Sequence, residues 1–222
     1  TGVEISWLTM SLASWLKGLI DRHHQLNNWL TSPNRERPPS FWLTGFFNPQ
    51  GFLTSMKQEV TRQHRAEQWS LDEVDYKTEV TKDIIPGDDG RIEGKQIKSV
   101  DEGVLIHGLF LEGSQWHKND KRFEEQTSKD LFFPFPIIHV SAESTNKENM
   151  DRAASKKADS GNKDKTHYFT PVYKYPKRND RYLIFRAFLK AEAPAGQIKL
   201  SQGVTPVMNW KLKGVALLCC KE

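Results

Sequence analysis

The residues that first suggest chemistry lie in a glycine-rich stretch at residues 90–96, GRIEGKQ. A phosphate-binding loop needs four residues between its glycines, followed by a lysine and then a serine or threonine that binds magnesium. Here three residues separate Gly90 from Gly94, and Gln96 stands where the hydroxyl is required. The stretch therefore does not predict a nucleotide site.

Potential metal ligands are present, but their spacing does not favour a metal site. Asp88–Gly90 resembles the middle of a calcium-binding EF-hand loop, yet Ile85 and Gly87 would occupy the first and third ligand positions. The adjacent His23 and His24 would point about 100° apart on a helix, too far to share one metal.

Two further histidines, His107 and His139, each lie inside an apolar run that is typical of a buried strand. If the two strands are neighbours, the pair could bind zinc. A hydrogen-bonded core or interface histidine is the more common arrangement, so it is the favoured interpretation.

Patterns of nucleophilic catalysis are missing from the sequence. It contains neither a G-x-S-x-G elbow nor a C-x-x-C pair, and a carboxylate such as Glu112 at a strand end is found in any sheet. Cys219 and Cys220 are adjacent, which is a poor geometry for a disulfide and favours a reducing compartment. The sequence thus predicts no catalytic, cofactor-binding or metal-binding residue, and a protein that is not an enzyme by itself.

Composition points to a polar, mixed surface. The 222 residues include 32 basic and 28 acidic side chains, a net charge of +4, and the mean hydropathy is −0.65. Charges of both signs interleave along the sequence, which argues against a nucleic-acid partner. Polar residues interrupt the apolar N-terminal stretch too often for a membrane span, so no membrane partner is expected.

Two amphipathic helices are predicted in the first third of the sequence. Apolar residues recur at steps of three and four between Ser11 and Leu30, and Ser32–Pro33 should end that helix. Asn48 can cap a second helix that begins at Pro49.

Strand-like segments follow, separated by turns and without helical periods between them. They are Val74–Val80, Val104–Leu111, Pro136–Ala142, His167–Lys174, Arg181–Lys190 and Asn209–Cys220. The fold class is therefore α+β: helices followed by an antiparallel six-stranded sheet or a small β-barrel. We expect residues 1–68 to form a helical segment and residues 69–222 a β-barrel-like segment.

Residues 143–165 have a different composition from their surroundings. They contain no aromatic and no aliphatic β-branched residue, so they cannot bury enough surface to offset their ordering entropy. We expect a mobile, disordered polar loop there, with partner docking as the alternative.

An aromatic cluster lies between the two predicted helices, interrupted by glycine and proline. Its members, which we call the aromatic joint, are Phe41, Trp42, Phe46, Phe47 and Phe52. A membrane wedge would need flanking lysines, and a base-stacking platform would need interleaved basic residues. The cluster is therefore interpreted as a hydrophobic joint where helix meets sheet or a neighbouring domain.

Four sequence blocks resemble one protein family. They are FWLTGFFNPQGFLTSMKQEVTR (Phe41–Arg62), VLIHGLFLEGSQW (Val104–Trp116), TPVYK (Thr170–Lys174) and GVALLC (Gly214–Cys219). Together with the helix sequence before them, they are similar in order and interval to the extreme C-terminal region of dynein heavy chains, over nearly the whole sequence. Asn48–Phe52 is closer to axonemal dyneins than to cytoplasmic ones. Residues 143–165 are a longer insertion than the family pattern predicts.

The resemblance implies a non-catalytic cap that packs on the ring of AAA-type ATPase modules of the same heavy chain. It also implies that the aromatic joint is a structural or ring-docking joint, and that the cap needs no cofactor and modulates ATP-driven movement. Through the full motor the partners would be microtubules and other dynein subunits, on the cytoplasmic side, in the axoneme of a cilium or flagellum. The alternative is a free-standing ligand- or protein-binding domain, and a hydrolase that uses sheet-end carboxylates is a more distant one.

Overall fold

The computed structural model describes residues 11–33, 36–81, 97–145, 166–191 and 204–221. The rejected phosphate-loop stretch, residues 90–96, lies outside these ranges, and so does the predicted polar loop from residue 146 onward. Glu143 and Ser144, at the start of that loop, belong to strand β8 instead.

The two predicted helices are confirmed. Helix α1 spans Leu12–Thr31, and the Ser11 hydroxyl oxygen caps it by accepting a hydrogen bond from Ser14 N. Helix α2 spans Pro49–Gln63, and the Asn48 side-chain oxygen accepts from Gly51 N at 2.9 Å. The N-termini of both helices follow the expected capping chemistry, in which a side-chain oxygen accepts a hydrogen bond from an unpaired amide of the first turn.

The strands form two larger sheets and a hairpin. A four-stranded sheet has the order β1-β3-β8-β2, with bounds Phe41–Trp42, Val104–His107, Ile138–Ser144 and Val74–Val80. A five-stranded sheet has the order β10-β9-β11-β4-β7, with bounds Leu183–Lys190, His167–Tyr173, Ala216–Leu218, Phe110–Glu112 and Phe132–Pro134. The hairpin pairs β5 (Gln115–His117) with β6 (Arg122–Glu124).

The α+β class is right, but the single antiparallel six-stranded sheet or small barrel is wrong. The predicted strand Val104–Leu111 divides at Gly108, whose φ of +84° is readily adopted only by glycine. Its first half joins one sheet and its second half the other. Two pairs are parallel, β1 with β3 and β11 with β9, so the sheets are mixed. The described strands do not close into one barrel.

The predicted last strand, Asn209–Cys220, is also wrong in its first half. A seven-residue helix, α5 (Pro206–Leu212), precedes a short β11. Thr205 caps this helix and Pro206 occupies its first position, which together favour a helix start. The Trp210 ring is fully buried, and its Nε1 donates to Ala191 O at 2.8 Å. This anchor explains why the alternating pattern does not form a strand.

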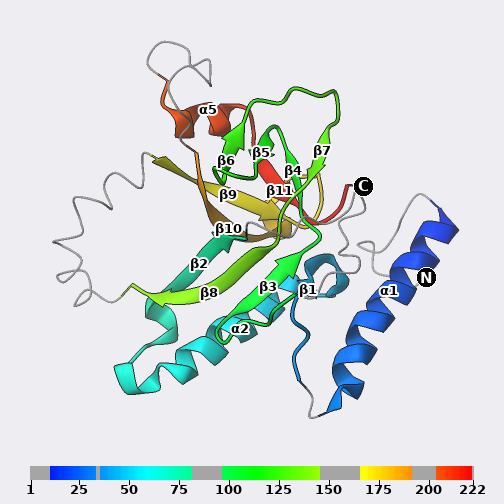
Figure 1. The fold of residues 1–222 in the computed structure, drawn as a ribbon, viewed down its shortest axis with the longest axis vertical. Coiled ribbons are helices and arrows are strands. Elements are labelled where there is room, and N and C mark those ends of the chain that lie inside the picture. The colour runs from blue at the N-terminus through cyan, green and yellow to red at the C-terminus, as the bar shows by residue number, and fades with distance from the viewer. Residues whose placement is uncertain (1–10, 34–35, 82–96, 146–165, 192–203, 222) are drawn as a thin grey trace.

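Helix α2 lies against the four-stranded sheet, whereas α1 lies beside its edge strand β1 (Figure 1). The sheets meet where the Thr78 hydroxyl of β2 bonds the backbone of Phe188 in β10, accepting from Phe188 N at 2.8 Å. One hydrophobic core contains residues of α2, of β1 and of both sheets. The predicted segments 1–68 and 69–222 therefore share a core, and β1 of the first completes a sheet of the second.

Candidate docking surface

Helix α1 is attached through its inner side to β1 and the turn that follows it. The Gln25 carboxamide makes two hydrogen bonds with the backbone of Trp42, accepting from its N at 2.7 Å and donating to its O at 3.2 Å. Arg22 donates to Thr44 O and lies over the Trp42 ring. A Cβ on Gly45 would come within 2.5 Å of Gln25 Nε2, so this close approach favours glycine.

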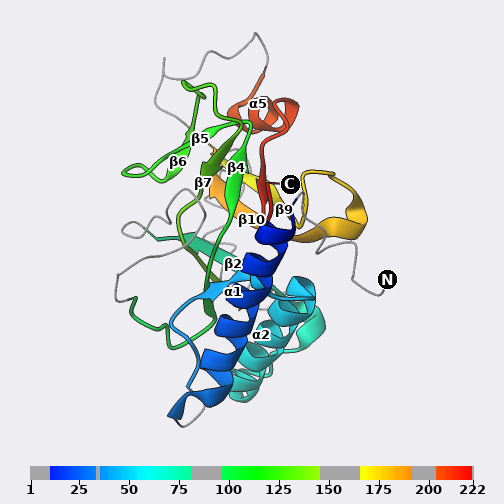
Figure 2. The same cartoon turned by 90° about the vertical axis from the view of Figure 1, so that its right-hand side faces the viewer.

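The other side of α1 presents aliphatic side chains to solvent. None of the residues of α1 is buried. Its exposed large aliphatics, which we call the outer stripe, are Leu12 (72% exposed), Leu16 (44%), Leu19 (38%), Ile20 (54%) and Leu30 (75%). In Figure 2 the helix lies at the front of the molecule. Contiguous apolar surface of this kind marks an interaction site more often than scattered apolar residues do.

The sequence predicts the apolar periodicity of α1 but not its division into two faces. Trp29 and Leu26 pack inward, where the Trp29 ring lies 5.1 Å from the Phe41 ring, while the outer stripe is exposed. Viewed down the helix axis, the apolar residues of α1 cover an arc of about 180°, with Trp29 at one edge and Ile20 at the other. A single contact needs an arc of roughly 100°. This width is the signal in the sequence that one contact does not account for all the apolar residues of α1.

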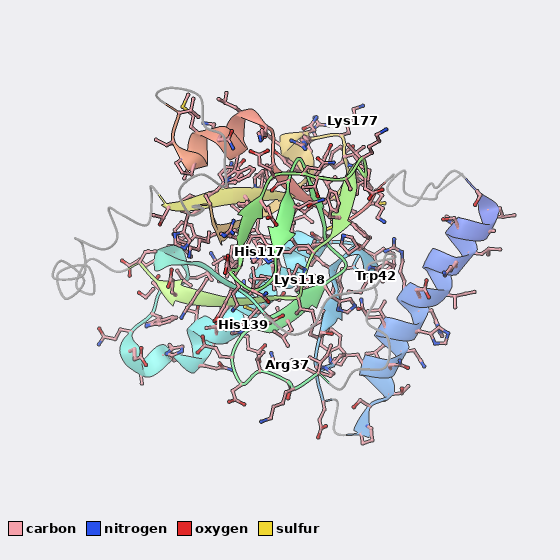
Figure 3. All side chains as sticks on the ribbon, turned by 45° about the horizontal axis from the view of Figure 1, so that its top comes forward. Arg37, Trp42, His117, Lys118, His139 and Lys177 are labelled. Carbon is pink, nitrogen blue, oxygen red and sulfur yellow. The ribbon has the colours of Figure 1, made fainter. Side chains whose placement is uncertain are left out.

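The aromatic joint is mostly interior. Phe41 and Phe46 are buried at 2% and 9% exposure, and Phe52 packs on both, with its ring 4.1 Å from that of Phe46. Trp42 is half-buried between α1 and the sheet, as Figure 3 shows. These four side chains connect α1, β1 and α2. Only Phe47 among the five is exposed, at 54%.

The histidines considered as zinc ligands lie on neighbouring strands, β3 and β8. The His139 ring is hydrogen-bonded through Nε2 to Glu102 O at 2.8 Å, and burial lowers the pKa of His107 to about 4. Over the described residues no group of three or more histidine, cysteine or acidic side chains is placed to hold a metal ion. Glu112, the possible acid, instead accepts a hydrogen bond from Arg178 at 2.7 Å.

A cluster of ionisable groups that sequence reasoning misses joins the end of α2 to the four-stranded sheet. His64 Nε2 lies 2.8 Å from Glu102 Oε2, and its Nδ1 lies 3.0 Å from Glu67 Oε1. The hydrogen bond with Glu102, and then that with Glu67, raises the pKa of His64. The hydrogen bond with His64, and then that with Ser141, lowers the pKa of Glu102. Each partner favours the charged form of the other, so the cluster is a structural clamp.

The helices of the described residues do not include a membrane-spanning segment. None of them combines the length and the apolar content that a membrane-spanning segment requires.

Comparison with known proteins identifies the relatives of this sequence. Residues 3–219 match the family described as the C-terminal domain of the dynein heavy chain. Dynein axonemal heavy chain 8 of Homo sapiens is 35% identical over 219 residues, and dynein axonemal heavy chain 5 of Mus musculus is 36% identical over 217 residues. Each alignment covers 97% of this chain and 4% of the relative.

A relative from a third organism gives the same result. The dynein gamma chain of the flagellar outer arm of Chlamydomonas reinhardtii is 43% identical over 135 residues, which cover 61% of this chain and 3% of the relative. The chain thus spans about 4% of the length of the curated relatives it matches. With the match over residues 3–219 and these identities, the chain belongs to the family of C-terminal domains of dynein heavy chains, and its relatives are axonemal dyneins.

Proposed function

We propose that this domain is a non-catalytic cap that packs on the AAA-type ATPase ring of an axonemal dynein heavy chain and modulates ATP-driven movement on microtubules. The observation that carries the proposal is the outer stripe of α1. The helix is anchored on its inner side and leaves its outer aliphatic side exposed in the described structure.

The stripe offers enough apolar surface to matter energetically. Complete burial of a leucine or isoleucine contributes about 2 kcal/mol. Burying the exposed parts of Leu12, Leu16, Leu19 and Ile20 would then contribute about 4 kcal/mol to docking. The relatives are far longer than this chain, so most of the heavy chain lies outside it and supplies a partner in cis.

The cap would act by preferring one arrangement of the ring over another. A surface that contacts two ring modules shifts the balance of nucleotide states only if its contacts differ between those states. In this proposal the domain itself contributes no catalytic residue and binds no cofactor. Its influence on ATP hydrolysis reaches the catalytic modules through docking, and the motor would work in the axoneme of a cilium or flagellum.

The test is a charge insertion into the stripe of the intact heavy chain. The double substitution Leu16→Glu with Leu19→Glu removes apolar contact and places two carboxylates where they must be desolvated, which should cost at least about 3 kcal/mol of docking free energy. We expect altered microtubule gliding velocity and altered coupling of ATP hydrolysis to microtubule binding. Ser14→Glu with Asn28→Glu adds the same charge on the polar side of α1 and should leave both unchanged.

Two results would contradict the proposal. One is a motor whose velocity and ATPase coupling are unaffected by the stripe substitution although the protein is folded. The other is robust ATP hydrolysis by the isolated 222 residues, because the proposal places catalysis elsewhere. A free-standing binding domain would instead tolerate both double substitutions equally.

A further inference from the structure

Positive charge is concentrated in one part of the molecule. The described residues 166–191 and 204–221 include nine lysines and arginines against one acidic residue, Asp180. All other residues together include 23 basic and 27 acidic side chains. The small net charge therefore combines a basic end with an acidic remainder, and the expectation of evenly interleaved charge does not hold here.

Part of this charge lies on the connector between β9 and β10, residues 174–182. Its shape is fixed by local hydrogen bonds: Lys174 N donates to Tyr182 O at 2.8 Å, and Asn179 Oδ1 accepts from Arg181 N at 3.0 Å. The Tyr175 and Tyr182 rings pack edge-to-face with centroids 5.1 Å apart. A segment held this way loses little conformational entropy when a partner binds.

The connector and the start of α2 enclose a groove of about 160 Å³. At about 30 Å³ per water molecule, this volume admits roughly five waters, or one side chain. Its walls include Phe47, Lys174, Arg181 and Ile184. The Lys174 ammonium donates to Phe47 O at 3.1 Å, which ties the connector to the one exposed member of the aromatic joint. The Phe47 ring and two cations, Lys174 and Arg181, thus line the same groove.

The cations differ in how far they are neutralised. Arg178 forms an ion pair with Glu112 at 2.7 Å and also donates to Gly214 O, so it has a structural role. Lys177 and Arg181 are exposed and form no ion pair with any residue that the structure describes. Figure 3 shows Lys177 pointing away from the body of the protein. Arg181 lines the groove, and Lys177 lies on the same connector outside the groove lining.

We propose that this groove receives an acidic side chain, next to an apolar residue that packs on Phe47, from a segment of the same heavy chain outside these 222 residues. Charge complementarity selects a carboxylate for Lys174 and Arg181, and Lys177 adds positive charge on the same connector. An aromatic anchor beside cations is the composition that carries most binding energy in protein interfaces. The contact would be a second, polar attachment point of the cap.

The heavy chain itself is the favoured source of the acidic segment. The relatives extend about 25-fold beyond the matched region, as the 4% coverage implies, so an intramolecular partner is always present at high effective concentration. In Figure 2 the connector projects at the level of the first turns of α1. Nucleic acid is disfavoured because the two tyrosine rings pack on each other instead of forming an open stacking platform.

This inference rests on the proposed function, since it assumes docking in cis, but its chemistry can be tested separately. A carbodiimide couples a lysine amine directly to a carboxylate with no spacer, so it reports only pairs in contact. In the intact heavy chain we expect crosslinks from Lys177 or Lys174 to an aspartate or glutamate outside this domain. Exposed Lys98 and Lys118 provide the background yield.

Two variants complete the design. Lys177→Glu with Arg181→Glu should lower the crosslink yield at Lys174 about tenfold, whereas Lys98→Glu with Lys118→Glu should not change it. The yield should also fall as salt rises, because the screening length shortens from about 10 Å at 0.1 M to about 3 Å at 1 M. Docking of the outer stripe of α1 should be far less sensitive to salt, and hydrogen exchange of α1 monitors it independently.

The outcomes separate the two proposals. Crosslinks from Lys174 or Lys177 to a different polypeptide, or yields no higher than at Lys98, would overturn the acidic contact. Equal yields in the charge-reversed variant would do the same. Rapid exchange of α1 despite the expected crosslinks would overturn the apolar docking and leave the groove in place.

Discussion

Helices α1 and α2 have similar amphipathic patterns but opposite surroundings. Helix α2 buries Pro49, Leu53, Met56 and Val60 against the sheet, whereas α1, which is longer, has no buried residue. Within the described residues, the inner side of α1 contacts the rest of the domain through Gln25, Arg22 and Trp29. The comparison teaches that a stripe of apolar residues does not by itself show what it packs against: α2 buries its stripe within the domain, whereas the outer stripe of α1 stays exposed in the described structure.

The largest expected effect comes from truncating matched leucines in the two helices. Leu53 is fully buried, so Leu53→Ala should lower the free energy of unfolding by about 2–5 kcal/mol, as cavity-forming substitutions do. Leu16 is 44% exposed, and Leu16→Ala should change it by less than about 0.5 kcal/mol. Urea unfolding of the isolated domain measures both. Comparable losses at the two positions would mean that the outer stripe is covered within these 222 residues.

A smaller effect is expected at the attachment of α1. Gln25→Ala removes both hydrogen bonds to the Trp42 backbone, which should cost about 1–2 kcal/mol because the partner groups are partly buried. The loss should be local, with faster hydrogen exchange in α1 and unchanged exchange in α2. Asn28→Ala, on the polar side of α1, is the matched control and should not change hydrogen exchange in either helix. Equal acceleration in both helices would show that α1 is not independently attached.

The smallest effect concerns the His64 clamp at the end of α2. Its raised pKa means that His64 contributes stability below its ordinary value of 6.5, and this contribution is lost as pH rises through the folded-state pKa. The lowered pKa of Glu102 means that its contribution is present above 4.5 and is lost as pH falls through the folded-state pKa. Both contributions are therefore present between about pH 4.5 and 6.5.

Replacing His64 tests this sign. The wild-type domain should lose on the order of 1 kcal/mol or less of unfolding free energy as pH rises above that window, because exposed ion pairs are weak. In His64→Gln this loss should disappear. The measurement is urea unfolding at several pH values with His117→Gln as a control. A wild-type domain that gains stability relative to His64→Gln as pH rises above 6.5 would show that the clamp has been assigned the wrong sign.

Local structure is more predictable from this sequence than tertiary organisation. The cap at Asn48 and the strand Val74–Val80 depend on neighbouring residues, and the predictions there are confirmed. The division of Val104–Leu111 depends on one backbone angle at Gly108 and on distant partner strands, which local patterns do not encode. Trp210 similarly gains its burial from Ala191 and Phe123, and that distant anchoring favours α5 over a strand.

The candidate site is only partly predictable for the same reason. The aromatic joint is visible in the sequence as a cluster, but the sequence does not show which of its side chains are buried and which are exposed. In the structure Phe47 is the exposed one of the five. The basic connector is hidden by the small net charge of the whole sequence. Counting charge over individual strands and connectors is the signal that reveals it, because nine basic residues fall in the two short segments 166–191 and 204–221.

Hydrogen exchange of α1 tests the central claim most directly. The rates of its amides should be measured in the isolated domain and in the intact heavy chain under the same conditions. If the outer stripe docks on the ring, exchange in the heavy chain should be slower by at least about tenfold, the factor that corresponds to about 1.4 kcal/mol of added protection. Equal rates in the two proteins would contradict the account, because α1 would then present its apolar side to solvent in the assembled motor.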